Sequence, residues 1–278
     1  MDQKEHFQRL NRYYEKSKVG FNVLLWGSKH FGFYPKNNKI SEKEAQLLMQ
    51  DLVAEKLNLK KSMKVLDAGC GQGVVSTYLA QKFGCKIQGI TVVPFEIKKA
   101  QFLAKKMNVS HLVNYSFMDY SNMEFKDNTF DAIYTTETLF HSINIKKTLK
   151  EFFRVLKKRG KITLFEYTIA QDNEFSDYEM GMLNAVIYSS AMDGLKDFRH
   201  NKFQHIIREI GFKDVKIENI SNNIKPSFAR LRRFFLIPYF FVKLFRMQKH
   251  FPNATASVEY YKMLEKDLFR YNIFTAEK

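Results

Sequence analysis

Short apolar runs alternate along the chain with segments whose apolar residues recur at helical spacing. Strands are predicted at residues 63–67, 86–91, 112–117, 131–135, 161–167, 213–220 and 270–276, with helices at 74–83, 94–107, 149–156 and 202–210. Strands that alternate with helices of about 10 to 15 residues are typical of a parallel sheet with helices on both faces. We therefore predict a doubly wound α/β sheet, in which ligands bind at the carboxyl ends of the strands.

One further segment, residues 230–251, interleaves seven aromatic residues with basic ones and contains no acid. This pattern fits a membrane anchor, a nucleic-acid surface or the wall of an apolar site. The longest apolar run, residues 234–242, is interrupted by Pro238, whereas a spanning helix needs about 20 residues. We expect a soluble protein that at most contacts an anionic membrane surface from outside.

Composition adds constraints on size, partners and compartment. The 278 residues are 45% hydrophobic, enough for one large core, and the net charge of +16 favours anionic partners. Cys70 and Cys85 have no paired spacing and no histidine cluster, which predicts neither disulfides nor a metal site. The polar first ten residues lack a secretory pattern, so a cytoplasmic location is expected.

The first residue-level indication of chemistry is VLDAGCGQG, residues 65–73. An acid, Asp67, ends the strand, and Gly69, Gly71 and Gly73 follow. Such glycines let the backbone approach a ligand, and the next helix offers free amides. A dinucleotide site would need G-x-G-x-x-G with its acid roughly 20 residues later. The observed order suits a ligand with an amino group and a carboxylate, as in S-adenosylmethionine; an ordinary strand-to-helix turn is the alternative.

VLDAGCGQG resembles motif I of the class I S-adenosylmethionine-dependent methyltransferases, which have a Rossmann-like seven-stranded sheet. The resemblance continues through residues 118–141 and 152–167. It implies that S-adenosylmethionine is the cofactor. It also implies that the methionine part is lined by Asp67, Gly69, Cys70, Gly71 and Gly73, the adenine by Asp119 and Tyr120, and the sulfonium end by Thr136.

Residues 13–35, YYEKSKVGFNVLLWGSKHFGFYP, resemble the N-terminal signature of the tocopherol and sterol side-chain methyltransferases. The matching positions are Tyr13, Tyr14, Trp26, Gly27, His30, Gly32 and Tyr34. Aromatic rings there would shield the sulfonium from water, with a cation–π attraction of about 1 kcal/mol. The resemblance implies that Tyr14 contacts the cofactor and that Tyr13, Trp26 and His30 contact the substrate. Packing of the rings into the core is the alternative.

The turn after the second strand, GITVVPFEIKKA at residues 89–100, departs from the wider family. Many methyltransferases place an acid at the end of this strand to hold the ribose, whereas Ile90, Thr91 and Val92 stand here. The tocopherol, sterol and cyclopropane-fatty-acid group has a similar turn with a glutamine at the position of Glu96. We predict that Thr91 and Glu96 contact the cofactor, with the carboxylate accepting from ribose hydroxyls.

Catalytic residues are expected on ETLFH, residues 137–141, just beyond the fourth strand. Glu137 and His141 would share one face if this segment is helical. A neutral histidine takes a proton from a hydroxyl or an acidic carbon, and a carboxylate orients it or stabilises a developing cation. The alternatives are a structural hydrogen bond for His141 and a tie between the N-terminal segment and the sheet for Glu137.

Nucleic acid is disfavoured as the substrate despite the basic charge. Methyltransferases of exocyclic base amines carry Asn or Asp followed by Pro-Pro and an aromatic after the fourth strand, where this chain has TTETLF. Methylation of an RNA base carbon uses a cysteine near that edge. Cys70 lies in the glycine turn and Cys85 precedes the second strand.

Residues 221–267 form the predicted insertion before the last strand, and Pro226 and Pro238 divide it into two helical pieces. Each piece sets apolar residues against basic ones at helical spacing. The side chains expected at the substrate are Phe228, Arg230, Phe235, Phe241 and Phe245. A basic solvated face over a core helix is the alternative. The resulting division is an N-terminal helical cap at 1–58, a core at 59–220, a substrate lid at 221–267 and the final strand at 268–278.

These observations together predict a methyltransferase for a small lipophilic acceptor that is isoprenoid, sterol-like or prenylated. Methylation at carbon is favoured, and a prenyl diphosphate would bring the arginines into use. Methylation at oxygen or nitrogen of another amphiphilic molecule is the first alternative. A protein that binds the cofactor or a membrane surface without catalysis is the second.

Overall fold

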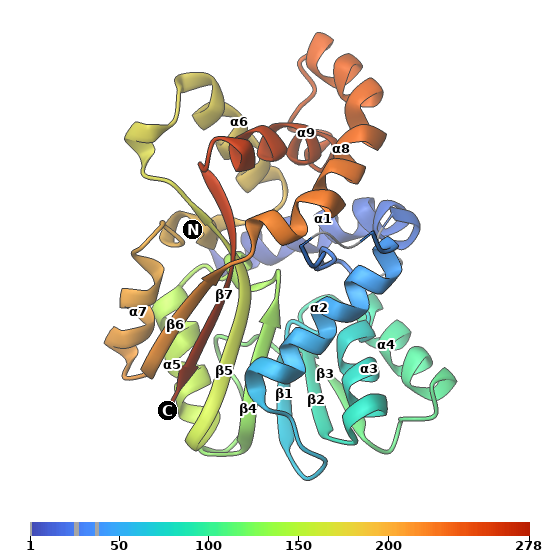
Figure 1. Ribbon diagram of the computed structural model, residues 1–278, viewed down its shortest axis with the longest axis vertical. Coiled ribbons are helices and arrows are strands. Elements are labelled where there is room, and N and C mark those ends of the chain that lie inside the picture. Colours follow the sequence, from blue (N-terminus) through green and yellow to red (C-terminus); the bar gives the residue numbers. More distant parts are fainter. Residues whose placement is uncertain (1, 25–27, 37–38) are drawn as a thin grey trace.

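A computed structural model describes residues 2–24, 28–36 and 39–278 (Figure 1). The strands are β1 (Lys64–Ala68), β2 (Lys86–Thr91), β3 (Val113–Phe117), β4 (Phe130–Thr136), β5 (Leu156–Ile169), β6 (Lys213–Asn219) and β7 (Phe269–Glu277). The helices are α1 (Gln3–Leu24), α2 (Glu42–Leu57), α3 (Val74–Phe83), α4 (Pro94–Lys106), α5 (Ile145–Val155), α6 (Asp177–Ser189), α7 (Phe203–Ile210), α8 (Ser221–Leu244) and α9 (Pro252–Glu265).

The seven strands form one sheet in the order β3-β2-β1-β4-β5-β7-β6. Strands β1 to β5 pair in parallel, and β7 runs antiparallel between β5 and β6. The chain therefore leaves β1 toward one edge through β2 and β3, and later toward the other edge through β4 and β5. This reversal confirms the doubly wound α/β fold and leaves a crevice at the carboxyl ends of β1 and β4.

The core lies between the sheet and the helices on its two faces (Figure 1). Val65 and Leu66 of β1 and Ile133 of β4 are fully buried, because strands of a parallel sheet are covered on both faces. Helices α2, α3 and α4 pack together on one side, and α5 and α7 pack together on the other. These two helix layers fix the direction in which the carboxyl ends of the strands point.

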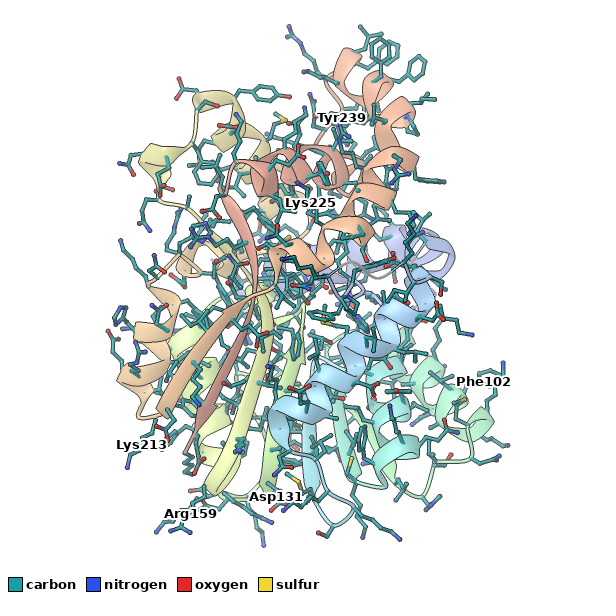
Figure 2. All side chains as sticks on the ribbon, in the orientation of Figure 1. Phe102, Asp131, Arg159, Lys213, Lys225 and Tyr239 are labelled. Carbon is teal, nitrogen blue, oxygen red and sulfur yellow. The ribbon has the colours of Figure 1, made fainter. Side chains whose placement is uncertain are left out.

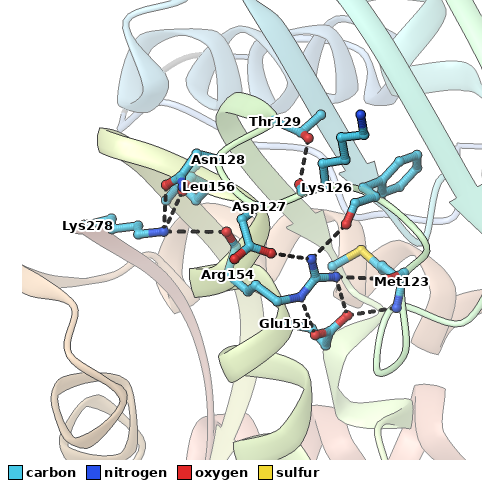
Figure 3. Close-up of polar contacts among 10 residues, drawn as sticks. Met123, Lys126, Asp127, Asn128, Thr129, Glu151, Arg154, Leu156 and Lys278 are labelled. Carbon is cyan, nitrogen blue, oxygen red and sulfur yellow. Dashed lines mark hydrogen bonds and ion pairs between the residues drawn. The ribbon is translucent and has the colours of Figure 1, made fainter.

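The loop between β3 and β4 is held by Arg154 near the end of α5 (Figure 3). Its guanidinium donates to the Met123 carbonyl at 2.9 Å and to Asp127 Oδ1 at 2.8 Å. Glu151 pairs with the same guanidinium and accepts from the Met123 N–H at 2.8 Å. The loop after β3 is therefore held to α5 at Met123 and Asp127.

Helices α1, α6, α8 and α9 lie over the carboxyl ends of the strands (Figure 1). The predicted division of the insertion into two helical pieces is wrong, because α8 is one helix of 24 residues with Pro226 and Pro238 inside it. An internal proline costs a helix about 3 kcal/mol. Contacts of Tyr239 and Val242 with Val258 of α9 offset this cost.

In the part of the chain that the structure describes, two helices precede β1, and α8 and α9 lie between β6 and β7, where the sequence places an insertion. Helix α2 contacts α3 and β5, so it covers the sheet. The division of the chain at residues 58, 220 and 267 stays a prediction. Within the described residues, no helix has the length and apolar character needed to cross a membrane.

Candidate active site

A cavity of about 210 Å³ lies at the carboxyl edge of the sheet, under α1, α8 and α9. The glycine turn forms one part of its lining. Aromatic side chains form another, namely Tyr13, Tyr14, Phe31, Phe140, Tyr167, Phe228, Phe235, Tyr260 and Phe269. Backbone suited to a polar ligand and an apolar wall therefore share one cavity.

Most of the predicted site residues meet in this cavity. They are Tyr13, Tyr14, Asp67, Gly69, Cys70, Gly71, Thr91, Glu96, Asp119, Tyr120, Thr136, Glu137, His141, Phe228 and Phe235. The cavity lining does not include Gly73, His30, Arg230, Phe241 or Phe245, and Trp26 lies outside the described residues.

Two glycines of the turn have different roles. Gly71 has φ +51°, and a Cβ there would meet nothing closer than the Glu96 carboxylate at 3.9 Å, so the turn presents bare backbone to the cavity. A Cβ at Gly73 would lie 2.6 Å from the Tyr115 hydroxyl. Gly73 therefore permits close packing of α3 on the sheet, and its contact with the cofactor stays a prediction.

Asp67, one residue before the end of β1, lines the cavity and is only 1% exposed. Its Oδ2 atom has no hydrogen-bond partner among the described residues, and burial raises the pKa of Asp67 to about 7. A buried carboxylate oxygen without a hydrogen-bond donor is costly. The ammonium group of S-adenosylmethionine would supply the missing donor, so the residues present fit this cofactor.

Glu96 begins the next helix and is 2% exposed. Its Oε2 accepts from the Thr91 hydroxyl at 3.2 Å, and its Oε1 pairs with the ammonium of Lys29. That ammonium also lies 4.1 Å from the ring centre of Tyr14. A ribose hydroxyl that binds Glu96 would share the carboxylate with Lys29. Lys29 is not among the residues predicted from the sequence, although it stands beside His30 in the segment that resembles the family.

At the end of the cavity where the adenine is predicted to bind, Asp119 is tied both to its own loop and to α1. It accepts from the N–H and the hydroxyl of Ser121, each at 2.8 Å, and from the Gln3 amide at 2.8 Å. The Tyr120 hydroxyl donates to the Thr138 carbonyl at 3.1 Å. Helix α1 therefore covers this end of the cavity.

Glu137 has φ +53°, a strained value for a residue with a side chain. Its carboxylate accepts from the Phe31 N–H at 2.8 Å, from the Tyr271 hydroxyl at 3.1 Å and from the Tyr167 hydroxyl. Burial raises the pKa of Glu137 to about 7. Glu137 thus ties the N-terminal segment to the sheet and also presents an acid to the cavity.

His141 ends a short 3-10 helix at Leu139–His141 that begins after Glu137. The predicted shared helical face of Glu137 and His141 is therefore wrong. Nδ1 of His141 lies 2.8 Å from the Ala191 carbonyl, which only accepts, so Nδ1 carries the proton. Nε2 then accepts from the Tyr14 hydroxyl at 3.0 Å. Burial lowers the pKa of His141 to about 3, so this histidine is neutral and holds Tyr14 in place.

Glu166 of β5 supports the loop that carries both residues. Fully buried, it accepts from the Thr135 hydroxyl at 2.8 Å and from the Thr138 and Leu139 N–H groups at 3.3 and 2.9 Å. Burial raises the pKa of Glu166 to about 8. The loop after β4 is therefore anchored by a carboxyl group that stays protonated near neutral pH.

This anchor predicts a pH dependence of stability. Between the ordinary pKa of a glutamate and about 8, the unfolded chain releases a proton that folded Glu166 keeps, so the free energy of unfolding falls as pH rises. The Glu166→Gln variant should reduce this fall by about 1 kcal/mol or more. Urea unfolding at pH 5 and pH 8 measures it, and an unchanged difference between the two pH values would contradict it.

The remaining predicted substrate residues lie elsewhere. His30 is 1% exposed and contacts the Phe31 carbonyl at 2.9 Å and Gln50 at 3.3 Å. Arg230 pairs with Glu42 at 3.1 Å. Both side chains contact α2 and lie outside the cavity lining, and their contacts with the substrate stay predictions.

Phe241 and Phe245 are 52% and 66% exposed and do not line the cavity, so their place at the substrate stays a prediction. Because α8 is continuous, the stripe that starts at Phe228 and Phe235 continues to Tyr239 at helical spacing. The two phenylalanines then fall on the outer side.

Sequence reasoning also missed Tyr167 and Tyr271, which hold Glu137, and the stretch around α6. Tyr167 lies at the carboxyl end of the strand predicted at residues 161–167, where ligands are expected, so its position could have indicated a place at the site. Tyr271 lies on the last strand, far from Glu137 in sequence. Val186, Ser190 and Met192 line the cavity from α6 and the turn after it.

Comparison with known proteins agrees with this geometry. The family model described as "Methyltransferase domain" matches residues 59–226. An S-adenosyl-L-methionine-dependent Diels-Alderase from Talaromyces variabilis is 27% identical over 97% of this chain and 94% of its own length. The chloroplastic tocopherol O-methyltransferase of Arabidopsis thaliana is 27% identical over 91% of this chain and 77% of its own.

The sterol 24-C-methyltransferase of Candida albicans is 27% identical over 74% of this chain, but the match spans only 54% of that enzyme. Two solved structures share the fold along 98% of the chain. They are the [4+2]-cyclase SpnF, with a TM-score of 0.77 at 24% identity and 96% of its chain covered, and the mycolic acid cyclopropane synthase CmaA1, with 0.84 at 16% and 98%. The chain therefore belongs to the class I S-adenosylmethionine-dependent methyltransferases, in the group that includes the sterol and tocopherol methyltransferases.

Proposed function

We propose that the protein methylates a carbon atom of a small lipophilic acceptor with an isoprenoid, sterol-like or prenylated skeleton. The observation that carries this proposal is the single cavity that joins the glycine turn and Asp67 to an aromatic wall and to Glu137. The acceptors named for the sterol and tocopherol relatives support the same class.

The charge of the lining supports an apolar acceptor. Among the described residues that line the cavity, Lys29 is the only lysine or arginine, and it pairs with Glu96. A diphosphate group would need more cationic partners to offset the loss of its hydration. A phosphorylated acceptor stays a prediction, and the described cavity lining offers its phosphates little positive charge.

When bound, S-adenosylmethionine would supply the methyl group, which leaves the sulfonium sulfur by in-line displacement. When the acceptor is an alkene, its π electrons form the new carbon–carbon bond as the carbon–sulfur bond breaks, and the positive charge stays on the neighbouring acceptor carbon. The rings of Tyr13, Phe140 and Tyr167 would stabilise that charge.

The cation is quenched when an adjacent C–H bond gives up its proton to a base. Glu137 is suited to this step, because it faces the cavity and its pKa is near 7. His141 is a poorer proton acceptor, because burial lowers its pKa to about 3 and the Tyr14 hydroxyl already occupies Nε2. We assign His141 the positioning of Tyr14.

The proposal is tested with the purified protein, S-adenosylmethionine and an acceptor panel of an acyclic isoprenoid, a sterol and a prenylated phenol. Mass spectrometry should show a product heavier by one methyl group, together with S-adenosylhomocysteine in equal amount. Turnover of none of the three, in protein that binds S-adenosylmethionine, would contradict the proposed acceptor class.

A second candidate function is cyclisation of a polyene in the presence of the cofactor without methyl transfer. The observation that favours it is the match to the Talaromyces variabilis Diels-Alderase along nearly the whole of both chains. Such a reaction gives a product of unchanged mass and no S-adenosylhomocysteine. It also needs no proton acceptor, so the Glu137→Gln variant would leave it intact.

A further inference from the structure

The end of α8 exposes an unusual amount of apolar surface. Nine of the fifteen large hydrophobic side chains that are exposed in the described chain fall within residues 233–251, which we call the α8 tip. They include Phe234, Ile237, Phe240, Phe241, Leu244 and Phe245, with Ile237 74% exposed. Apolar patches of this kind on a soluble protein mark a site of interaction.

The tip is an ordered part of the fold. In Figure 1, α8 extends past α9 and away from the sheet, and Figure 2 places Tyr239 on this outer part. The Tyr239 hydroxyl donates to Glu259 Oε1 of α9 at 2.8 Å, and Val242 packs on Val258. Because these inner contacts fix the helix, its other side chains are held outward as one surface.

The charges on this surface all have the same sign. Arg233, Lys243, Arg246 and Lys249 are exposed, and none of them forms an ion pair with a residue that the structure describes. Residues 221–258 contain no Asp or Glu. A second copy of this chain would bring like charges together, whereas an anionic surface complements them.

We propose that the α8 tip docks the protein onto an anionic lipid bilayer. Its aromatic and aliphatic side chains enter the headgroup region, and its basic side chains contact lipid phosphates. Docking goes beyond the proposed function, since it requires no methyl transfer. Helix α8 also lines the cavity through Phe228, Leu231 and Phe235, so a docked tip brings the cavity close to the phase in which lipophilic acceptors dissolve.

Sedimentation with vesicles tests the proposal on the full chain without methyl donor or acceptor. The protein should bind vesicles of phosphatidylcholine mixed with phosphatidylserine, and binding should weaken in 1 M salt, where the Debye length falls to about 3 Å. The triple variant Ile237→Ser, Phe241→Ser, Phe245→Ser should bind at least about tenfold more weakly.

Matched control variants distinguish a role of the α8 tip from a general effect of removing exposed apolar or basic side chains. Phe102 on α4 is 70% exposed and Phe245 is 66% exposed, so Phe245→Ser should weaken binding and Phe102→Ser should not. Likewise, glutamine at Arg233, Arg246 and Lys249 should weaken binding about tenfold or more. Glutamine at the exposed Lys86, Lys105 and Lys106 changes the net charge equally and should have little effect.

Three results would overturn the proposal. The folded protein does not sediment with anionic vesicles, the triple serine variant binds as well as the parent, or both glutamine sets weaken binding equally. A dimer that the serine variant converts to monomer, without vesicle binding, would assign the tip to a second copy. None of these results bears on methyl transfer, which is measured separately.

Discussion

The Glu137→Gln variant is expected to lower kcat for an alkene acceptor by about 10²-fold or more, with the affinity for S-adenosylmethionine little changed. The amide keeps the size of the side chain but accepts no proton from the cationic acceptor. Steady-state kinetics together with calorimetry of cofactor binding measure the two effects. A variant with the kcat of the parent would remove Glu137 from the chemistry.

The pH profile gives this prediction a second readout. Because burial raises the pKa of Glu137 to about 7 and the ionised carboxylate is the active form, kcat should rise as pH increases through about 7. The Tyr271→Phe variant removes a hydroxyl that donates to Glu137 and favours its ionised form. It should therefore shift the rise to higher pH, whereas a purely structural role of Glu137 would leave the profile in place.

The Asp67→Asn variant is expected to weaken S-adenosylmethionine binding by about 10- to 100-fold. The buried Oδ2 atom has no partner among the described residues, so a ligand ammonium would gain a charge-assisted hydrogen bond there. Asparagine keeps the shape and loses the charge. Isothermal titration calorimetry measures the change in Kd, and the larger truncation Asp67→Ala should abolish detectable binding.

Two controls separate this effect from unfolding. Asp131 pairs with Lys157 at the opposite edge of the sheet (Figure 2), so Asp131→Asn should leave Kd unchanged. The thermal midpoint of cofactor-free Asp67→Asn should not fall, because no described hydrogen bond to Oδ2 is lost. An unchanged Kd in Asp67→Asn would show that the cofactor does not use this carboxylate.

Much of the sheet follows from local pattern. The short runs predict all seven strands. The central strands β1 and β4 are mostly buried because a parallel sheet is covered on both faces, whereas the edge strand β6 is mostly exposed. Strand β5 begins at Leu156, earlier than expected. Leu156 pairs with Phe130 of β4, and no local sequence pattern specifies this partner. Helix α6 was missed, since its residues show no apolar stripe that distinguishes them from a loop.

The two halves of the site differ in how far sequence reveals them. The cofactor side comes from short motifs, in which Asp67 and Gly71 are neighbours in the chain. The acceptor side depends on the rotation of α8 and on distant pairs such as Glu137 with Tyr271, which spacing does not specify. The rotation of α8 explains why Phe235 faces the cavity while Phe241 does not. The cytoplasmic location stays a prediction.

The central claim is methyl transfer from S-adenosylmethionine to a lipophilic acceptor in the cavity that contains Asp67 and Glu137. The most direct measurement incubates the protein with methyl-labelled S-adenosylmethionine and, in separate reactions, a lipid extract, an RNA pool and a pool of small amines. Label should enter the lipid fraction alone, and the Glu137→Gln variant should lose most of it. Label in RNA or amines only, or none in any pool while the cofactor binds, would contradict the account.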